Sequence, residues 1–205
     1  MKNYNELTED DGILLVKTAR KVVTEYLKTQ NKINLDDQFK KAFSENAGVF
    51  VTLNNQSGLR GCIGFPLPDK KLHQALPEAA IAAATEDPRF PAIKINELDE
   101  ITFEVTILTA PQKIQIDDPE NYPSQIKVGR DGLIIKSGLF SGLLLPQVPV
   151  EYHWDEIEFL NYTCEKAGIP KESWKKRDVE VLKFEGIVFK EEKPHGKIIR
   201  EELNN

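Results

Sequence analysis

Apolar residues recur at spacings of three and four along several segments of the chain, a period typical of helices that bury one face. In the first segment Thr8 stands three residues before Asp11, a pairing that forms a capping box at a helix start. In a later segment alanines fill most of the apolar stripe, which would permit close packing against a sheet. We predict helices over residues 8–28, 71–86 and 155–167, with a short helical turn over residues 39–42.

Other segments alternate apolar and polar residues, which is the period of a strand with one buried face. The clearest covers residues 101–108, in which the apolar side chains point to one face and Glu104 to the other. Residues 48–53 and 59–65 form a predicted hairpin, with Gly58 in its turn where a positive φ is required. Strands are predicted over residues 48–53, 59–65, 101–108, 126–128, 133–136, 142–145 and 179–189, and a loop over residues 119–123.

Helices and strands follow one another without a regular βαβα alternation, and tight hairpins are frequent. This order favours the α+β class, with a mainly antiparallel sheet flanked by helices. The chain has 205 residues, which suits one large domain or two small ones.

Composition and charge narrow the class of partner. Hydrophobic residues make up 40% of the chain and charged residues 29%, as in an ordinary globular protein. The 27 basic and 33 acidic residues give a net charge of -6, so we expect no nucleic-acid binding. No apolar run approaches the roughly 18 residues of a membrane span, and the start of the chain lacks a signal-peptide pattern. We therefore expect a cytoplasmic protein with no membrane partner.

Familiar cofactor and metal motifs are absent from the sequence. The two cysteines, Cys62 and Cys164, are expected to be reduced, because a chain of this length has a core of its own. No C-x-x-C or H-E-x-x-H occurs, so no metal site is predicted. The glycine-rich nucleotide loops are missing as well, and the sequence identifies no cofactor.

The segment LRGCIG, residues 59–64, is the first candidate for chemistry. Strand geometry puts Arg60 and Cys62 on one face, where a guanidinium would lower the pKa of the thiol and make it a nucleophile. Gly61 and Gly64 would let a ligand or another backbone approach. The alternative is that Cys62 is simply a small buried residue.

Glu104 is the second candidate, because it interrupts a strongly apolar strand. If that strand adjoins the LRGCIG strand, Arg60, Cys62 and Glu104 share a face and Glu104 would transfer protons. The alternative is an Arg60–Glu104 ion pair on a solvated sheet face.

Two loops supply the remaining candidates. A proline ends the helix at EDPRF and leaves Asp87 and Arg89 on a turn, where they would either bind a ligand or hold backbone groups. Further along, Pro146 constrains a turn that would present Gln147. His153 is the best-placed histidine for acid or base work, the alternative being a capping or packing role.

These segments together resemble the AMMECR-type family, in its archaeal or bacterial single-domain form. The resemblance covers roughly residues 10–190 and is carried, in order, by LRGCIG at 59–64, EDPRF at 86–90 with Pro91, FEVTILT at 103–109, VGRDGLII at 128–135, GLLLPQV at 142–148 and FLNYTCEKAGIP at 159–170. LRGCIG is the hallmark of the family. Two positions depart from the pattern, since Thr106 stands where many members have serine and His153 lies where the family varies.

The resemblance implies an α+β fold for one domain over residues 1–205. A larger lobe would contain both termini, a smaller lobe would be inserted, and the hallmark would lie near a cleft between them. It also implies a functional link to radical-SAM and Memo-type proteins, but it does not imply a reaction. Residues that match the family's motifs are Arg60, Gly61, Cys62 and Gly64 in the hallmark, Asp87, Pro88 and Arg89 in the turn, and Glu104 in the strand.

Two functions of different class follow from these residues. In the first, Cys62 is the nucleophile of a small-molecule enzyme, with Arg60 orienting an anionic substrate and Glu104 or His153 transferring protons. In the second, the same region is a non-catalytic module that holds a small anionic ligand or a protein partner. The substrate, the oligomeric state and the choice between enzyme and binding module stay open at this stage.

Overall fold

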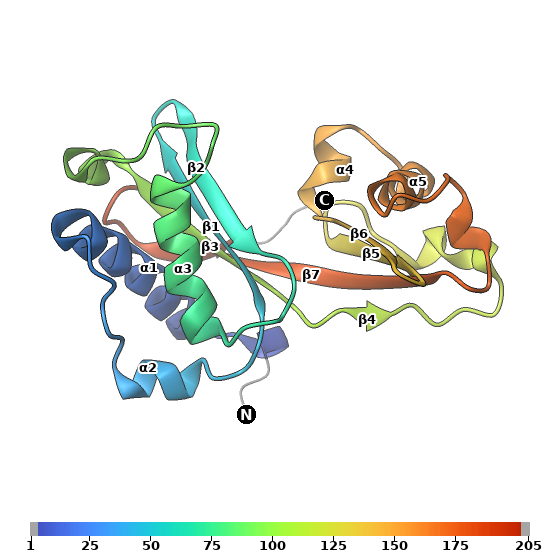
Figure 1. Ribbon diagram of the computed structural model, residues 1–205, viewed down its shortest axis with the longest axis horizontal. Helices are drawn as coiled ribbons and strands as arrows, with labels where there is room; N and C mark the ends of the chain where they lie inside the picture. The colour runs from blue at the N-terminus through green and yellow to red at the C-terminus, as the bar shows by residue number, and fades with distance from the viewer. Residues whose placement is uncertain (1–3, 202–205) are drawn as a thin grey trace. The chain divides into compact units, whose positions relative to one another are not determined.

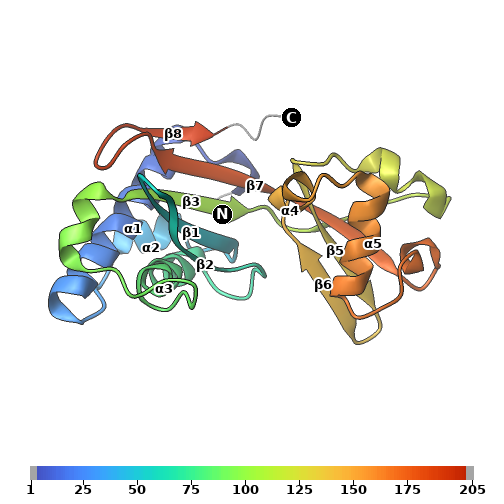
Figure 2. The same ribbon diagram turned by 90° about the horizontal axis from the view of Figure 1, so that it is seen from above.

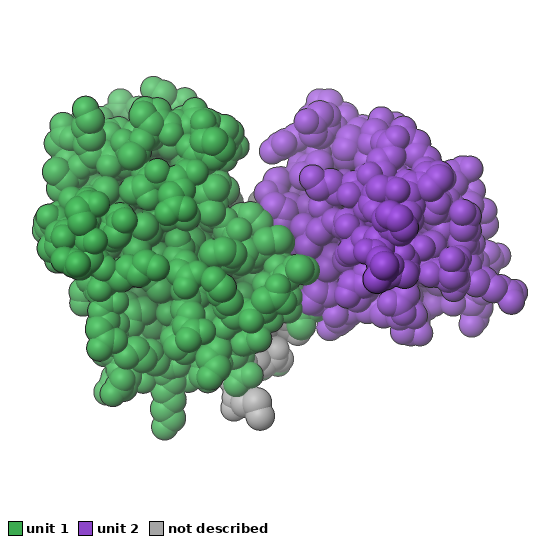
Figure 3. All heavy atoms as spheres, viewed as in Figure 1, with its two compact units in different colours: residues 1–110, 187–202 green, residues 111–186, 203–205 purple. Residues whose placement is uncertain are grey.

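The computed structural model describes residues 4–201, which divide into two compact units (Figures 1 and 3). Among the described residues, unit 1 holds 4–110 and 187–201, and unit 2 holds 111–186. Strand β7 (Glu180–Glu191) contributes residues to both. The predicted α+β class with a mainly antiparallel sheet is confirmed, and no helix among the described residues is long and apolar enough to cross a bilayer.

Unit 1 is built on an antiparallel sheet covered by helices. Its strands are β1 (Gly48–Asn55), β2 (Gly58–Phe65), β3 (Thr102–Leu108), the end of β7 and β8 (Ile198–Glu201), and its helices are α1 (Glu9–Thr29), α2 (Asp37–Ala42) and α3 (Leu72–Thr85). Strand β1 pairs with both β2 and β3, and β2 lies at the end of the strand order. Helices α1 and α3 pack against each other, α3 lies against β1 and β2, and α1 lies against β3.

The alternation predicted for residues 101–108 positions the core of unit 1. Phe103, Val105 and Ile107 are fully buried, whereas Glu104 on the opposite face is only half-buried. Thr8 and Asp11 form the predicted capping box at the start of α1. The sheet therefore has one apolar face, where the core lies, and one half-buried face that carries polar side chains.

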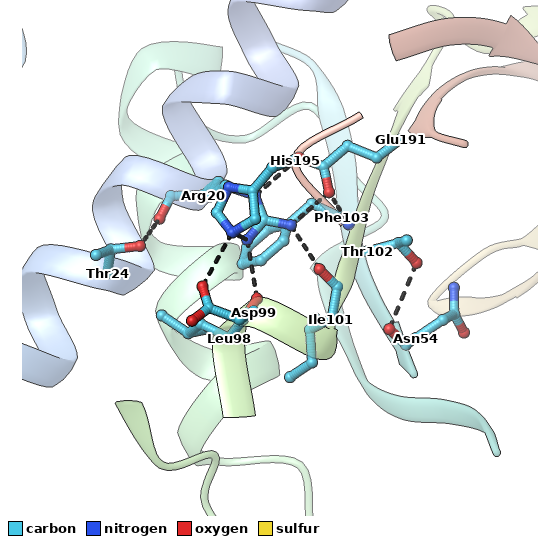
Figure 4. A network of polar contacts seen from close by, with 10 residues as sticks. All are labelled: Arg20, Thr24, Asn54, Leu98, Asp99, Ile101, Thr102, Phe103, Glu191 and His195. Carbon is cyan, nitrogen blue, oxygen red and sulfur yellow. Dashed lines mark hydrogen bonds and ion pairs between the residues drawn. The ribbon is translucent and has the colours of Figure 1, made fainter. Parts of the chain in front are cut away.

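Within unit 1, a buried ion pair joins helix α1 to the end of strand β7 (Figure 4). Arg20 of α1 donates to both carboxylate oxygens of Glu191 in β7, at 2.8 and 2.5 Å. The guanidinium also donates to the carbonyl oxygens of Leu98 and Ile101 and lies over the ring of Phe103. Every partner is a group that would be costly to bury alone, so this network holds the elements of unit 1 in place.

Unit 2 is a smaller sheet with its own core. It contains β4 (Gln112–Lys113), β5 (Asp131–Ser137), β6 (Phe140–Leu144), the first half of β7, α4 (Gln147–Glu151) and α5 (Glu156–Lys166). Helix α5 contacts β5 and β6 (Figure 2). Among its core residues are Phe159, Leu160, Cys164 and Trp174.

Three local expectations were wrong. Residues 126–128 form no strand, because Gly129 has φ 86° and the Asp131 carboxylate accepts the Lys127 N–H, which fixes a turn. Residues 119–125 form two 3-10 turns instead of a loop, since a proline at the first position of each presets φ. Gln147 begins the short helix α4 rather than a turn.

Several short elements had no counterpart in the sequence prediction. They are strands β4 and β8 and the 3-10 turns η1 (Tyr4–Glu6), η2 (Ile95–Glu100) and η5 (Ser173–Lys175).

Candidate functional site

Three polar side chains lie in one row across strands β2, β1 and β3. In the register of the sheet, Thr52 stands opposite Cys62 on one side and opposite Glu104 on the other. Directly opposed residues of antiparallel strands project to the same face. Cys62 and Glu104 thus share a face, although their strands are not neighbours, because β1 lies between them.

The Thr52 hydroxyl connects the two outer members of this row. Its Oγ1 lies 3.3 Å from the Cys62 Sγ, and the same side chain stands directly opposite Glu104, whose pKa it lowers. We call Cys62, Thr52 and Glu104 the polar row. All three side chains are half-buried, so they are partly shielded from water while staying within reach of it.

Burial raises the pKa of the Cys62 thiol above its ordinary value. The hydrogen bond with Thr52 and the positive charge of Arg89 lower it, whereas the negative charges of Glu104 and Asp87 raise it further. Burial has the largest effect. This environment therefore favours the neutral thiol, whereas the sequence predicted a thiolate.

The pKa of Glu104 is raised as well, mainly because the carboxyl group is partly buried. The negative charge of Glu201 adds to the effect, and Lys190 and the hydrogen bond from Thr52 oppose it. A carboxylate in this state holds a proton more readily than an exposed one does.

Arg60 does not act on the thiol, contrary to the sequence prediction. The register pairs Leu53 with Gly61 and Asn54 with Leu59, so Arg60 is the extra residue of a β-bulge. Bulges change the direction of the side chain they carry. The Arg60 guanidinium donates to Glu97 at 3.1 Å and to the Pro91 carbonyl at 2.7 Å.

Glu97 is therefore the ion-pair partner of Arg60, and the expected pair with Glu104 is wrong. The Arg60 side chain is 11% exposed, and its donors are used to attach β2 to the segment that follows α3. A role for Arg60 in binding substrate stays a prediction.

Asp87 and Arg89 hold the backbone of Cys62. The buried Asp87 carboxylate accepts the Cys62 N–H at 2.8 Å, and Arg89 donates to the Cys62 carbonyl oxygen at 3.4 Å. The two side chains are also bonded to each other, with Arg89 Nε 2.9 Å from Asp87 Oδ1. These bonds, those to Arg89 foremost, keep the pKa of Asp87 far below its usual range.

Of the two roles expected for Asp87 and Arg89, ligand binding or bonding to backbone groups, the structure shows the bonding to backbone groups. Because the Arg89 side chain is 54% exposed, part of its guanidinium still faces solvent beside the thiol.

The two glycines of the hallmark serve close packing. A Cβ on Gly61 would lie 2.1 Å from the carbonyl oxygen of Ala83 in α3, and one on Gly64 would lie 2.3 Å from that of Val49 in β1. The sequence predicted that either a ligand or another backbone would approach these glycines. At both glycines the neighbouring group is a backbone carbonyl.

Gln147 and His153 belong to unit 2, whereas the polar row is built from unit 1 alone. Both side chains are exposed, and His153 has a left-handed backbone with φ 56°. Their roles in binding and proton transfer stay predictions.

The sequence reasoning missed Thr52, although a signal was present. Thr52 is the polar residue within GVFVTL, residues 48–53, and a five-residue turn to the next strand places it close to Cys62 in a hairpin. Glu97, the partner of Arg60, carried no comparable signal. Among residues 4–201, no three His, Cys, Asp or Glu side chains are grouped so that they could hold a metal ion.

Comparison with known proteins identifies the family of this chain. A family model described as AMMECR1 matches residues 16–189, which is most of the sequence and includes the polar row. The chain belongs to the AMMECR1 family. The resemblance predicted from the LRGCIG hallmark and the motifs around it is thereby confirmed.

Several archaeal proteins are similar to this chain over nearly their full length. Protein PYRAB00100 of Pyrococcus abyssi is 48% identical over 203 residues, covering 97% of this chain and 98% of the relative. A protein of Methanocella arvoryzae is 49% identical over 199 residues, covering 96% and 99%. The crystal structure titled Uncharacterized Protein PH0010, from Pyrococcus horikoshii, has a TM-score of 0.80 at 48% identity and covers 95% of this chain and 98% of that one.

Proposed function

We propose that unit 1 carries a cysteine-centred site for a small molecule, in which Cys62 is the nucleophile and Glu104 receives its proton through Thr52. The observation that supports this is the polar row, in which Thr52 Oγ1 lies 3.3 Å from Cys62 Sγ and the Thr52 side chain stands directly opposite Glu104. A general base close to a nucleophile is one of the arrangements that activate it, and here a hydroxyl stands between the two.

The proton moves in two linked steps. The Cys62 S–H donates to Thr52 Oγ1 while the Thr52 O–H donates to a carboxylate oxygen of Glu104. Transfer along both bonds leaves a thiolate and a neutral carboxylic acid. No new charge is created in the half-buried row, since one negative charge moves from Glu104 to Cys62. The raised pKa of Glu104 favours this transfer, because it makes the carboxylate a better proton acceptor.

Arg89 supplies the cation that Arg60 was expected to supply. Its positive charge lowers the pKa of the thiol, and its half-exposed guanidinium is able to bind an anionic group of a substrate. The thiolate then forms a bond from Sγ to an electrophilic carbon. The leaving group departs with its electron pair and takes the proton held by Glu104. The substrate class is thus a small anionic molecule with an electrophilic carbon.

One observation favours a second candidate, a binding module without catalysis. Because burial favours the neutral thiol, Cys62 would serve there as a small neutral side chain, and Arg89 would hold an anionic ligand or a protein partner. This candidate needs no proton transfer along the polar row.

The rate of alkylation by iodoacetamide as a function of pH separates the two candidates. Mass spectrometry follows Cys62, with the fully buried Cys164 as an internal check that the chain stays folded. If Glu104 assists attack, the rate at Cys62 rises twice, first as Glu104 ionises and again as the thiol ionises. Glu104→Gln and Thr52→Val would each abolish the first rise. A single rise at the thiol pKa in the unaltered protein would favour the binding module.

A further inference from the structure

Three aromatic rings in unit 2 form a continuous stack. The rings of Tyr152 and Trp154 are 5.0 Å apart between centroids with 18° between their planes. Those of Trp154 and Tyr162 are 4.0 Å apart at 9°. Trp154 therefore has a ring on each face, and the stack ends at Tyr152 on one side and at Tyr162 on the other.

A cation closes one end of this stack. The Lys171 ammonium lies 4.3 Å from the ring centroid of Tyr162. Because Trp154 covers one face of Tyr162, Lys171 lies over the opposite face. The faces of aromatic rings carry partial negative charge and attract cations. At the other end Tyr152 is 64% exposed, so the outer face of this ring is open to solvent.

The backbone holds the open ring in place. His153, between the first two rings, has φ 56°, a left-handed conformation that is uncommon for a residue other than glycine. The N–H groups of His153 and Trp154 donate to the carbonyls of Val150 and Pro149 in α4. Strained backbone fixed by its surroundings is frequent at binding sites.

The chain around the open ring is acidic. Residues 147–158 contain four acidic residues and no lysine or arginine; the acidic ones are Glu151, Asp155, Glu156 and Glu158. A segment with this charge attracts cations and repels polyanions such as nucleic acid.

We propose that the outer face of Tyr152 binds an arginine side chain from a basic segment of a partner protein. A guanidinium is planar and stacks on a ring face, and the neighbouring carboxylates add electrostatic attraction. Lys171 makes the corresponding contact at the other end of the stack within the protein itself. This proposal is independent of the chemistry assigned to Cys62.

Nuclear magnetic resonance of the full-length, isotope-labelled chain tests the proposal. A short arginine–glycine peptide is titrated to millimolar concentration, and the matched ligand replaces arginine with citrulline, which is planar but uncharged. We expect the arginine peptide to shift the indole N–H signal of Trp154 and the amide signals of Tyr152 and His153. The indole of the buried Trp174, bonded to Asn161, should not move.

Variants locate the contact. Tyr152→Ala should weaken binding about tenfold, whereas Tyr152→Phe, which keeps the ring, should bind as the unaltered protein does. Tyr152 is exposed, so neither change should alter the fold, and the unchanged Trp174 signal verifies this. Three outcomes would each overturn the proposal. The first is equal shifts with the citrulline peptide, and the second is no shift with the arginine peptide at millimolar concentration. The third is that a single-stranded oligonucleotide, used instead of the arginine peptide, produces the shifts.

Discussion

The carboxylate of Asp87 accepts the backbone N–H of Cys62 at 2.8 Å. This hydrogen bond therefore connects the turn after α3 to the centre of the LRGCIG strand. Because Arg89 holds Asp87 in turn, the position of the thiol depends on a turn that lies 25 residues further along the chain.

Asp87→Asn should destabilise the protein, because it removes the charge from a buried acceptor that bonds both Cys62 and Arg89. We expect a loss of about 2 kcal/mol in the free energy of unfolding, measured by urea denaturation at pH 7. A change below a few tenths of a kcal/mol would contradict the anchoring role.

The same substitution should alter the pH dependence of stability. The folded-state pKa of Asp87 is depressed, so its contribution is present above the unfolded-state pKa of about 3.9 and is lost as pH falls toward the folded-state value. In urea titrations between pH 7 and pH 3, the unaltered protein should lose more stability than Asp87→Asn does. If the stability of the two proteins fell in parallel with pH, Asp87 would not be the source of the pH dependence.

Arg89, and not Arg60, should control the ionisation of the thiol. Arg89→Met should raise the pKa of Cys62, because it removes the positive charge that lowers this pKa. Arg60→Met should leave the pKa nearly unchanged, since that guanidinium is bound to Glu97. The pH dependence of alkylation at Cys62 measures both, and the reverse order would contradict the assignment.

Gly61→Ala should separate α3 from the sheet, because the new methyl group would lie 2.1 Å from the Ala83 carbonyl oxygen. We expect a destabilisation of about 3 kcal/mol, within the range for overpacked cores. Gly58→Ala is the matched control: it meets no atom within 4 Å but has φ 107°. Its cost should be about 1 kcal/mol, from backbone strain alone.

The buried pair of Arg20 and Glu191 should behave non-additively. Glu191→Leu leaves a buried guanidinium without its carboxylate and should destabilise the protein by about 4 kcal/mol. Replacing both residues with leucine should cost less than the single change, because no uncompensated charge remains. Thermal or urea unfolding of the unaltered protein, Glu191→Leu, Arg20→Leu and the double variant checks this, and additive effects would contradict it.

The parts of the structure that the sequence revealed are those set by local patterns. The capping box of Thr8 and Asp11, the alternation around Glu104 and the turn at Gly58 each involve residues close together in the chain. The parts of the candidate site that were missed depend on pairing between strands. The bulge at Arg60 and the position of Thr52 between Cys62 and Glu104 follow from the register of the sheet, which no single segment specifies.

The bonds from Asp87 and Arg89 to the Cys62 backbone also affect the exposed edge of the sheet. Strand β2 ends the strand order of unit 1, and the outward backbone groups of such a strand offer a template on which a second chain could pair. At Cys62 both of these groups are occupied by side chains of the same molecule. By bonding these groups, the turn that carries Asp87 and Arg89 also opposes edge-to-edge pairing with a second chain at this point of β2.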